Sequence, residues 1–525
     1  MRPVVWRPPV EPSPVEQAVI KAVRRAKLFV FLRQHRHELF DQEFQAELAQ
    51  AYVDSPKGQP PVPPAQLALA TLLQAYTGVS DDEVIEATVM DRRWQLVLDC
   101  MDAGAPPFAK GTLVGFGKRL IEKNLDRRLV ERSVQLAAAT GGFGARALRA
   151  ALDSSPLWGA GRVEDTYNLM GHALRKALGV IAVLQGWGQA GGTAIVAAQA
   201  GVPQLAASSL KAALDKDWDD PATADQALAQ VLGFPGQVEQ FVAGWAGGQA
   251  AASAVAVACQ VRDQDVDLAG PVLALRRGVA KDRRISVEDG QMRHGRKSRS
   301  VLSGGYKRHV LRDLDTGLVP AVGITPANVP EAAVTSDITA DLEAAGFTLA
   351  ELHIDRACLA SDLVRDRSPD LAIFCKAWRV RNTGGRYPKT AFALDFTTRQ
   401  LTCPAGVTMS FEPGTTVHFP KATCAACPLR ARCTRSSNGR SVSIHPDEAL
   451  LAELRDCQAT PAGRARLRER VKAGHALAHI GHWQGRRARY RGTRKNLFDL
   501  RRVAVVHNLH VIARQPAGGG YKLAA

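Results

Sequence analysis

Long apolar segments are missing from this chain of 525 residues. It contains no run of eighteen apolar residues, the shortest length that reads as a bilayer-spanning helix. The first residues, Met1-Arg2-Pro3-Val4, also lack the apolar core of a secretory signal. The sequence therefore predicts a protein that stays in the cytoplasm and makes no membrane contact.

The nine cysteines do not form a disulfide framework, because their number is odd and all but four are scattered along the chain. The composition is otherwise ordinary for a globular protein, with 46% hydrophobic and 23% charged residues. A chain of this length is expected to form roughly two to four domains.

Acidic residues are scarce near the C-terminal end. Within 461–514, only Glu469 and Asp499 oppose twelve arginines and two lysines, a formal charge of +12 out of +17 for the chain. Flanking apolar residues with helical spacing predict that the segment is folded. Such a basic face favours nucleic acid, because neutralised phosphates release counterions. The alternative is a solvated pair of charged helices, which usually mixes Glu with Arg.

The order of predicted elements indicates an α/β protein with a mixed sheet. Residues 1–140 are predicted to be an all-helical N-terminal domain, and 146–165 to hold the first strand of the sheet. A large helical insertion follows. Strand-like segments at 285–287, 306–311, 317–324, 349–354 and 371–375, with a helix at 331–345, continue the sheet. The remaining boundaries are the insertion at 166–262, the rest of the sheet domain at 280–400, a Cys-rich knuckle at 401–440 and basic helices at 461–514.

Two aspartates stand at the ends of apolar strand-like segments, Asp153 in Ala-Ala-Leu-Asp and Asp355 in Leu-His-Ile-Asp. A carboxylate at the end of a buried strand is costly without a partner, and a divalent metal is a common one. Each aspartate alone is more typical of a turn or helix cap. Taken together with the basic segment, the pair favours metal-dependent phosphoryl transfer on nucleic acid.

Four cysteines form the only cluster, with the pattern C-x20-C-x2-C-x5-C. Four thiolates around a CxxC pair predict a tetrahedral structural Zn²⁺ site in an intracellular protein. The alternative is a set of reduced thiols in a loop. The cluster consists of Cys403, Cys424, Cys427 and Cys433.

A series of short motifs in a fixed order resembles the DDE transposases of bacterial insertion sequences. The segment 64–99 is similar to the helical N-terminal domain of the same proteins. The resemblance extends from about residue 60 to residue 514. The motifs are the strand ending at Asp153, Gly295-Arg296-Lys297-Ser298, Gly305-Tyr306-Lys307, Thr325-Pro326-Ala327-Asn328, His353-Ile354-Asp355-Arg356 and Arg486-Arg487-Ala488-Arg489-Tyr490-Arg491-Gly492.

The resemblance implies an RNase H-like core in which three acidic residues bind two Mg²⁺ or Mn²⁺ ions. It assigns Asp153 as the first acid and Asp355 as the second. It further implies that basic residues near these acids contact DNA phosphates, and Tyr490 is expected either to stack on an unpaired base or to pack in the core. The implied DNA-binding residues are Arg296, Lys297, Lys307, Arg486, Arg487, Arg489, Tyr490 and Arg491.

The third acid is where this sequence departs from the family pattern. The family carries a catalytic Glu on the helix before the arginine-rich motif, and the matching position here is Gly474. Glu469 is the nearest acid, but it lies five residues earlier, about 140° around a continuous helix.

The predicted function is that of an insertion-sequence transposase, an enzyme that cleaves DNA at the element ends and transfers the strands. Its expected partner is double-stranded DNA carrying inverted-repeat ends, to which the N-terminal helices contribute. It is expected to be a homo-oligomer when bound to DNA and to associate with the nucleoid. Two alternatives stay open: a catalytically inactive or domesticated DNA-binding relative, suggested by Gly474, and a general RNase H-like nuclease.

Overall fold

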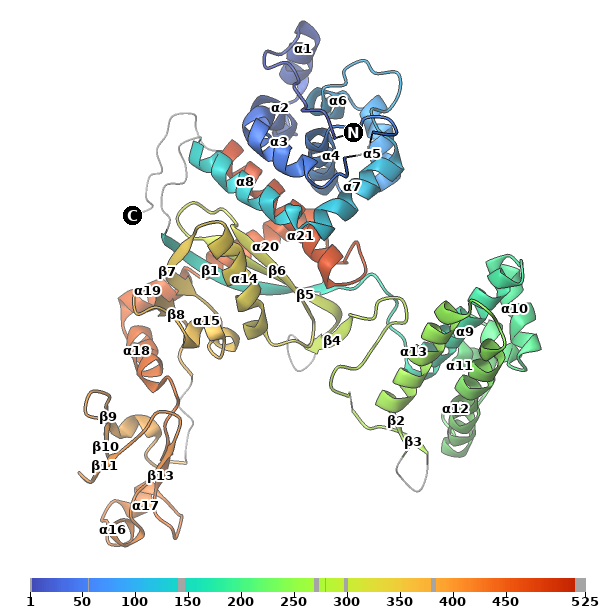
Figure 1. Cartoon of the computed structure of the whole chain (residues 1–525). Coiled ribbons are helices and arrows are strands. Elements are labelled where there is room, and N and C mark those ends of the chain that lie inside the picture. Colours follow the sequence, from blue (N-terminus) through green and yellow to red (C-terminus); the bar gives the residue numbers. More distant parts are fainter. Residues whose placement is uncertain are drawn as a thin grey trace.

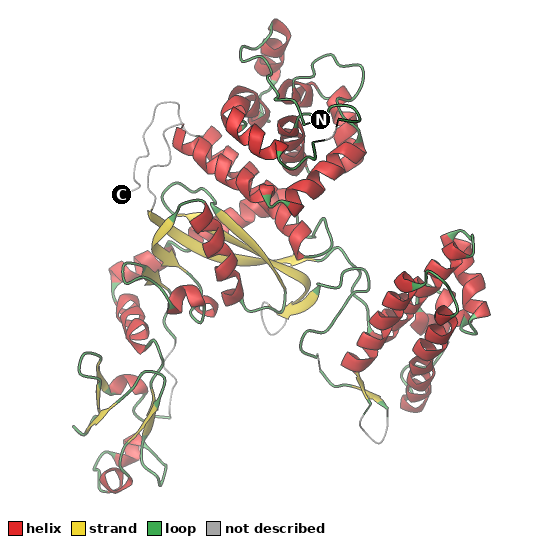
Figure 2. Ribbon diagram, in the orientation of Figure 1, coloured by secondary structure: helices red, strands yellow, loops and turns green. Residues whose placement is uncertain are grey.

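The computed structural model describes residues 2–54, 56–139, 147–268, 273–278, 280–296, 301–378 and 384–514. Lys297, one of the predicted DNA-binding residues, lies outside these ranges. The described part is a mixed α/β protein in which helices predominate and strands are concentrated in a central sheet and a small lobe (Figure 2). No helix in the described part is both long and apolar enough to cross a membrane.

The N-terminal segment contains eight helices, and its described residues contain no strand. Side-chain caps fix several of the helix starts. Ser13 with Glu16, and Ser80 with Glu83, form capping boxes that satisfy free backbone N–H groups at helix N-termini. The helices are α1 (Pro14–Ala22), α2 (Lys27–Leu39), α3 (Gln42–Ala49), α4 (Pro64–Thr77), α5 (Asp81–Met90), α6 (Arg92–Leu98), α7 (Lys110–Glu122) and α8 (Leu125–Ala139).

The central sheet has six strands, and β1 lies in its middle. β1 pairs antiparallel with β5 on one side and parallel with β7 on the other, and β8 continues the parallel side. β4 and β6 both pair antiparallel with β5. The strands are β1 (Ala147–Trp158), β4 (Arg293–Arg296), β5 (Leu302–Asp313), β6 (Ala321–Pro326), β7 (Thr348–His353) and β8 (Ala372–Phe374), and η2 (Glu331–Val334), α14 (Thr335–Ala344), η3 (Arg356–Cys358) and α15 (Asp362–Arg365) connect them.

Two strand predictions need correction. β1 does not stop at Asp153 but runs on to Trp158, because β5 continues to pair with it along Ser-Ser-Pro-Leu-Trp, which looks like a turn in the sequence. The apolar segment 285–287 is not a strand, although Ile285 and Val287 are buried. Burial alone produces the same apolar pattern as a strand does.

The helical insertion follows β1 and has its own hydrophobic core, formed mainly by α9, α12 and α13. Figure 1 shows it projecting from one end of the central sheet. Ala and Leu dominate its sequence, which suits closely packed helices. Its elements are α9 (Thr166–Leu184), α10 (Gln189–Gln199), η1 (Pro203–Ala206), α11 (Leu210–Ala213), α12 (Pro221–Ala243), α13 (Gln249–Asp265), β2 (Val266–Asp267) and β3 (Ala274–Leu275).

The small lobe carries the cysteine cluster and lies at the other end of the molecule (Figure 1). It begins before the predicted boundary at residue 400, because β9 pairs with β10 in a three-stranded sheet of this lobe. Its elements are η4 (Lys389–Ala391), β9 (Ala393–Asp395), β10 (Gln400–Thr402), β11 (Thr408–Ser410), β12 (Thr416–His418), α16 (Lys421–Ala425), α17 (Arg430–Cys433) and β13 (Ser441–Ser443).

Four helices follow the small lobe: α18 (Glu448–Ala459), α19 (Pro461–Arg468), α20 (Val471–Gln484) and α21 (Thr493–Ala513). α20 packs on one face of the sheet, where it contacts β1 and β5, and α14 packs on the other face. Alternate residues of β1 serve the two faces, as strand geometry requires. Ala151 packs with Ala473 of α20, whereas Ala150 and Leu152 share a cluster with residues of α14.

The last helix, α21, joins the N-terminal helices to the sheet domain. It packs against α4, α8 and β6, and its apolar residues belong to the same core cluster as those of α2 and α4. The N-terminal helices therefore share a core with the C-terminal helices and the sheet. Residue 140 divides the sequence by secondary-structure type but does not separate two independent cores.

A buried ion-pair cluster fastens α8 to α21. Asp126 is fully buried, and its carboxylate oxygens lie 2.6 Å from Arg494 Nη2 and 3.2 Å from Arg501 Nη1. Arg501, itself 5% exposed, also pairs with Asp341 of α14. One carboxylate thus holds two arginines that come from the far end of the sequence.

Replacing Asp126 with Ala should lower the free energy of unfolding by about 3–5 kcal/mol, because the change leaves buried Arg501 short of a counter-charge. Urea unfolding followed by circular dichroism measures the loss. The matched control is Asp82→Ala, since the carboxylate of Asp82 is exposed and pairs with the exposed Lys110. That control should cost at most about 1 kcal/mol. Equal losses in the two variants would contradict a structural role for the Asp126 cluster.

Candidate active site

The two predicted aspartates lie side by side at the edge of the sheet. The parallel register pairs Ala151 of β1 with His353 of β7, so Asp153 and Asp355, each two residues further on, leave the pairing together. Each carboxylate accepts a hydrogen bond from the next backbone N–H, at 2.9 Å from Ser154 N to Asp153 and 3.0 Å from Arg356 N to Asp355. The side chain of Asp153 is 24% exposed and that of Asp355 is 55% exposed, so solvent reaches the pair.

One guanidinium group reaches both carboxylates. Arg470 Nη1 lies 2.9 Å from Asp153 Oδ1, and Arg470 Nη2 lies 4.0 Å from Asp355 Oδ2. The two acids are therefore on the same side of the molecule and within the span of a single side chain. Arg470 was not among the site residues predicted from the sequence. Its contact with the two aspartates depends on the direction that its side chain takes from the turn before α20.

Gly474, the position at which the resemblance predicts a third acid, faces Asp153. A Cβ atom built on Gly474 would lie 3.7 Å from Asp153 Oδ2, with no other atom outside its own helix and adjacent residues within 4 Å. The glycine is on α20, which packs against β1. A side chain at this position would therefore point toward Asp153 and would have room to do so.

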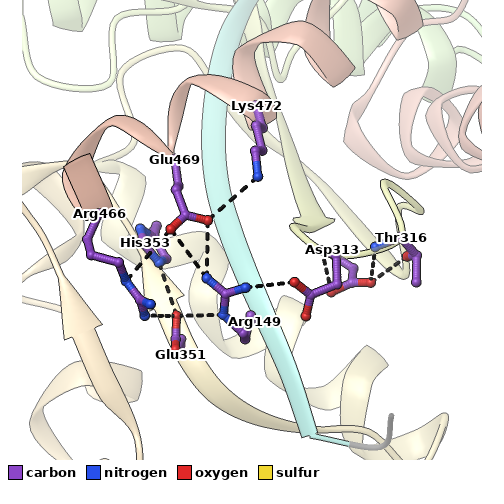
Figure 3. A network of polar contacts seen from close by, with 9 residues as sticks. Arg149, Asp313, Thr316, Glu351, His353, Arg466, Glu469 and Lys472 are labelled. Carbon is purple, nitrogen blue, oxygen red and sulfur yellow. Dashed lines mark hydrogen bonds and ion pairs between the residues drawn. The ribbon is translucent and has the colours of Figure 1, made fainter. Parts of the chain in front are cut away.

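Glu469, the nearest acid in the sequence, does not take that place. α19 ends at Arg468 and α20 begins at Val471, so Glu469 lies in the turn between two helices and not on one helix with Gly474. Figure 3 shows its carboxylate among the cationic side chains of Arg149, Arg466 and Lys472. Its oxygens lie 3.1 Å from Arg149 Nη2, 3.7 Å from Arg466 Nε and 3.6 Å from Lys472 Nζ.

The group around Arg149 keeps Glu469 in this position. Arg149 also pairs with Glu351 and Asp315, and Arg466 pairs with Glu351 (Figure 3). Burial works to raise the pKa of Glu351, but the hydrogen bonds from Arg466 and Arg149 lower it below its usual value. Neighbouring arginines thus favour the ionised form of Glu351.

A further acid near the aspartates was missed by the sequence reasoning. Glu331 of η2 accepts a hydrogen bond from Ser154 Oγ at 2.7 Å, immediately after Asp153. Burial, followed by the negative charges of Glu331 and Asp355, raises the pKa of the Cys358 thiol to about 12. The sequence did contain a signal for Glu331, because this residue follows the Thr325-Pro326-Ala327-Asn328 motif within three residues.

The basic residues predicted on the sheet are on the strands β4 and β5. Arg296 is exposed at the end of β4. Lys307 is half-buried on β5, opposite Pro156 of β1, and its Nζ donates a hydrogen bond to the Val329 carbonyl at 2.8 Å. The side chain of Lys307 therefore supports the loop before η2 in this structure.

The arginines of the motif before α21 mainly attach the loop that contains them to other parts of the chain. Arg487 donates to the carbonyls of Gly159 and Ala160, Arg489 donates to the Val79 carbonyl, and Arg491 pairs with Glu288 at 2.5 Å. These contacts connect the motif to the sheet, the N-terminal helices and the segment after the insertion. Arg486 is exposed.

Tyr490 packs against the hydrophobic core, which is the second of the two expectations for this residue. Its ring is partly buried, packs against the main core cluster and lies 6.3 Å from the ring of Phe498. Its hydroxyl accepts a hydrogen bond from Arg502 at 3.4 Å.

Distant acids neutralise much of the basic segment 461–514. Because acids are scarce within the segment, its arginines were expected to lack acidic partners. Six of them do have such partners elsewhere in the chain, so the expectation is wrong for these arginines. The partners are Asp81, Asp126, Asp153, Glu288, Asp341 and Glu351. These partners are invisible to a local count because they come from other parts of the chain. Arg468, Arg486 and Lys495 are exposed, and no hydrogen bond or ion pair engages their side chains within the described ranges.

The four clustered cysteines line one small cavity of about 30 Å³ in the small lobe. Cys424 and Cys433 come from α16 and α17, and Cys403 follows β10. Burial raises the pKa of Cys433, and the other three thiols act in the same direction. Among the described residues, no group of three or more His, Cys, Asp or Glu side chains is arranged closely enough to hold a metal ion.

Two family models match the chain. Residues 24–119 match the model described as Transposase domain (DUF772), and residues 402–513 match the model described as Transposase DDE domain. No curated protein and no solved structure matches the chain. The two matches support a DDE-type transposase of the insertion-sequence type, which confirms the resemblance. This class of protein carries out phosphoryl transfer on nucleic acid.

The matched ranges lie on either side of the aspartates. The first covers α2 to α6 and most of α7. The second covers most of the small lobe, the turn that contains Arg470 and the helix α20 that carries Gly474. Asp153 and Asp355 lie between them, and the pairing of β1 with β7 brings both next to α20.

Proposed function

We propose that this chain is a DNA transposase that cleaves and joins DNA at the ends of its element, with Asp153 and Asp355 at the reacting phosphate. The observation that carries the proposal is the adjacent position of these two carboxylates where β1 and β7 part. Part of the C-terminal basic segment lies on the same side, since α20 packs against β1. We also propose that the six-stranded sheet is the RNase H-like core, a proposal supported by its central strand β1 with antiparallel and parallel neighbours.

The two aspartates fit a divalent cation such as Mg²⁺ or Mn²⁺. Hard cations prefer carboxylate oxygens, and Mg²⁺ is commonly held by one or two carboxylates together with substrate phosphates. Two such ions, when bound, would stabilise the charge on the attacking and leaving oxygens of an in-line displacement. The task of Asp153 and Asp355 would be to hold the cations, and the solvent exposure of Asp355 would allow a phosphate to approach.

The proposed partner is double-stranded DNA with inverted-repeat ends. Arg468, Arg486 and Lys495 are exposed, and their charge is available for phosphates. Arg296, Lys297 and Lys307 are proposed to contact the DNA nearer the aspartates, and the N-terminal helices to bind the element ends. Because two ends must be joined, we propose that the protein acts as a homo-oligomer on DNA.

The exposed basic residues give the first test. The combined variant Arg468→Ala, Arg486→Ala and Lys495→Ala should reduce the slope of log affinity against log salt by roughly 2 to 3, since each phosphate contact contributes about 0.9. Fluorescence anisotropy of labelled DNA over a range of KCl concentrations measures it. Arg399→Ala is the control, because Arg399 lies in the small lobe and pairs with Glu412. An unchanged slope in the combined variant would remove these residues from the interface.

Gly474 gives the test of catalysis. In a DNA cleavage assay with Mg²⁺ and element ends, Gly474→Glu should increase cleavage by on the order of 10²-fold, because a third carboxylate beside Asp153 adds a cation ligand. Gly474→Gln is the matched control, since it has the same shape without the charge. Adding Asp153→Asn should abolish the gain.

Each result of that assay has a distinct meaning. Cleavage only by the Gly474→Glu variant would identify the native chain as an inactive DNA-binding relative. Cleavage of RNA–DNA hybrids with no preference for element ends would favour a general nuclease. If neither protein cleaves while both bind DNA, the aspartate pair is not the active site.

We further propose that Cys403, Cys424, Cys427 and Cys433 bind one structural Zn²⁺ ion, with the four thiols drawing closer than they lie in this structure. The support is their convergence on one cavity and the small core of the lobe, seven buried apolar residues. Small cores of this size commonly need a metal or disulfides to remain folded.

Metal analysis tests the zinc proposal. Purified protein should contain about one zinc per chain, and Cys424→Ser with Cys427→Ser should remove it. The same variant should make the small lobe sensitive to limited proteolysis, with no change in the rest of the chain. Cys457→Ser, in α18, is the control. Protein without zinc whose lobe resists proteolysis would instead establish the cysteines as reduced thiols.

A further inference from the structure

A cationic side chain occupies the space between the two aspartates. The guanidinium of Arg470 is 2.9 Å from Asp153 and 4.0 Å from Asp355 and is 30% exposed. Neighbouring residues fix this direction. Glu469 and Arg470 form the turn between α19 and α20, and Glu469 is bound by the cluster around Arg149, so the two side chains leave the turn toward different partners.

Two neighbouring carboxylates repel each other unless a positive charge lies between them. In this structure Arg470 supplies that charge. A divalent cation bound by the same two aspartates would need the same oxygens and would be repelled by the guanidinium at close range. Binding of the metal and the present position of Arg470 are therefore mutually opposed.

The absence of a side chain at position 474 strengthens the contact. Position 474 faces Asp153, the aspartate that lies nearer to Arg470. A carboxylate there would compete with Asp153 for the arginine. With glycine at this position, the nearest atom to its missing Cβ is Asp153 Oδ2, and Arg470 is left to the aspartates.

We infer that Arg470 is an internal competitor of the catalytic cation, which closes the aspartate pair when DNA is absent and moves to a DNA phosphate when DNA binds. The inference rests on the proposed function, because it takes Asp153 and Asp355 as the cation site. Arginine suits both positions, since its planar fork binds carboxylate and phosphate oxygens equally well. Its partial exposure gives the side chain a path from one to the other.

Direct measurement of Mn²⁺ binding tests the inference without relying on activity. Free Mn²⁺ is followed by electron paramagnetic resonance in the presence of the full-length protein. Arg470→Gln should bind Mn²⁺ about tenfold more tightly than the native chain, and Arg470→Lys should lie between the two. Arg464→Gln is the matched control, because it removes the same charge from an exposed side chain six residues before Arg470, and it should change the affinity less than twofold. Melting curves establish that each variant is folded.

Asp153→Asn separates this inference from the proposed function. In the Arg470→Gln background it should abolish the gain in Mn²⁺ affinity. If native and Arg470→Gln proteins bind Mn²⁺ equally and both lose it with Asp153→Asn, the competitor role is overturned and the cation site stands. If no variant shows binding that depends on Asp153, the cation site itself fails.

DNA supplies an independent measurement. A short duplex should increase the Mn²⁺ affinity of the native chain by drawing Arg470 away, and should increase that of Arg470→Gln distinctly less. An equal increase in both proteins would show that DNA acts on the cation site without Arg470, and the inference would be overturned.

Discussion

The parallel pairing of β1 with β7 is the constraint on which the proposed site depends. Because side chains alternate along a strand, a register shift of one residue would send Asp153 to the opposite face of the sheet from α20. The observed register brings Asp153 and Asp355 to the same edge and leaves Ala151 against Ala473 of α20. The hydrophobic residues on both faces of β1 thus stabilise the position of a carboxylate that is itself polar and partly exposed.

Charge in the C-terminal segment serves the fold as well as the proposed interface. Asp126, Asp341, Glu288 and Glu351 neutralise arginines that lie far from them in sequence. Two of these acids, Asp126 and Asp341, pair with arginines of α21, whose burial in the shared core would be costly without a counter-charge. The remaining exposed basic residues are few. The DNA interface is therefore expected to be narrower than the +12 charge of the segment suggests.

The turn between α19 and α20 decides which charge faces the aspartates. Adjacent residues of opposite sign, Glu469 and Arg470, leave this turn toward different partners. A family member with an acid at the position of Gly474 would place a carboxylate toward Asp153, whereas this chain places a guanidinium there. The proposed control of metal binding depends on this local geometry.

Local sequence was sufficient for much of the architecture. Helical periodicity, the Ser80–Glu83 capping box and the apolar segments of β5, β7 and β8 indicated the all-helical start, the insertion and the mixed sheet, because these signals act between residues close in the chain. The motifs also indicated the family and singled out the two aspartates that the structure places close together. The length of β1, the irregular segment 285–287 and the start of the small lobe were misjudged, since pairing with distant strands decides them.

What the amino-acid sequence indicated by itself was most of the elements, the family resemblance and the two aspartates as candidate site residues. What only the tertiary structure decided was which charges meet: Arg470 with the aspartates, Glu469 with Arg149, and the arginines of α21 with Asp126 and Asp341. The physical reason is the difference in the sequence separation over which these interactions act. Helix and strand propensities depend on neighbours in the chain, whereas ion pairs depend on distances in space that only the completed packing sets.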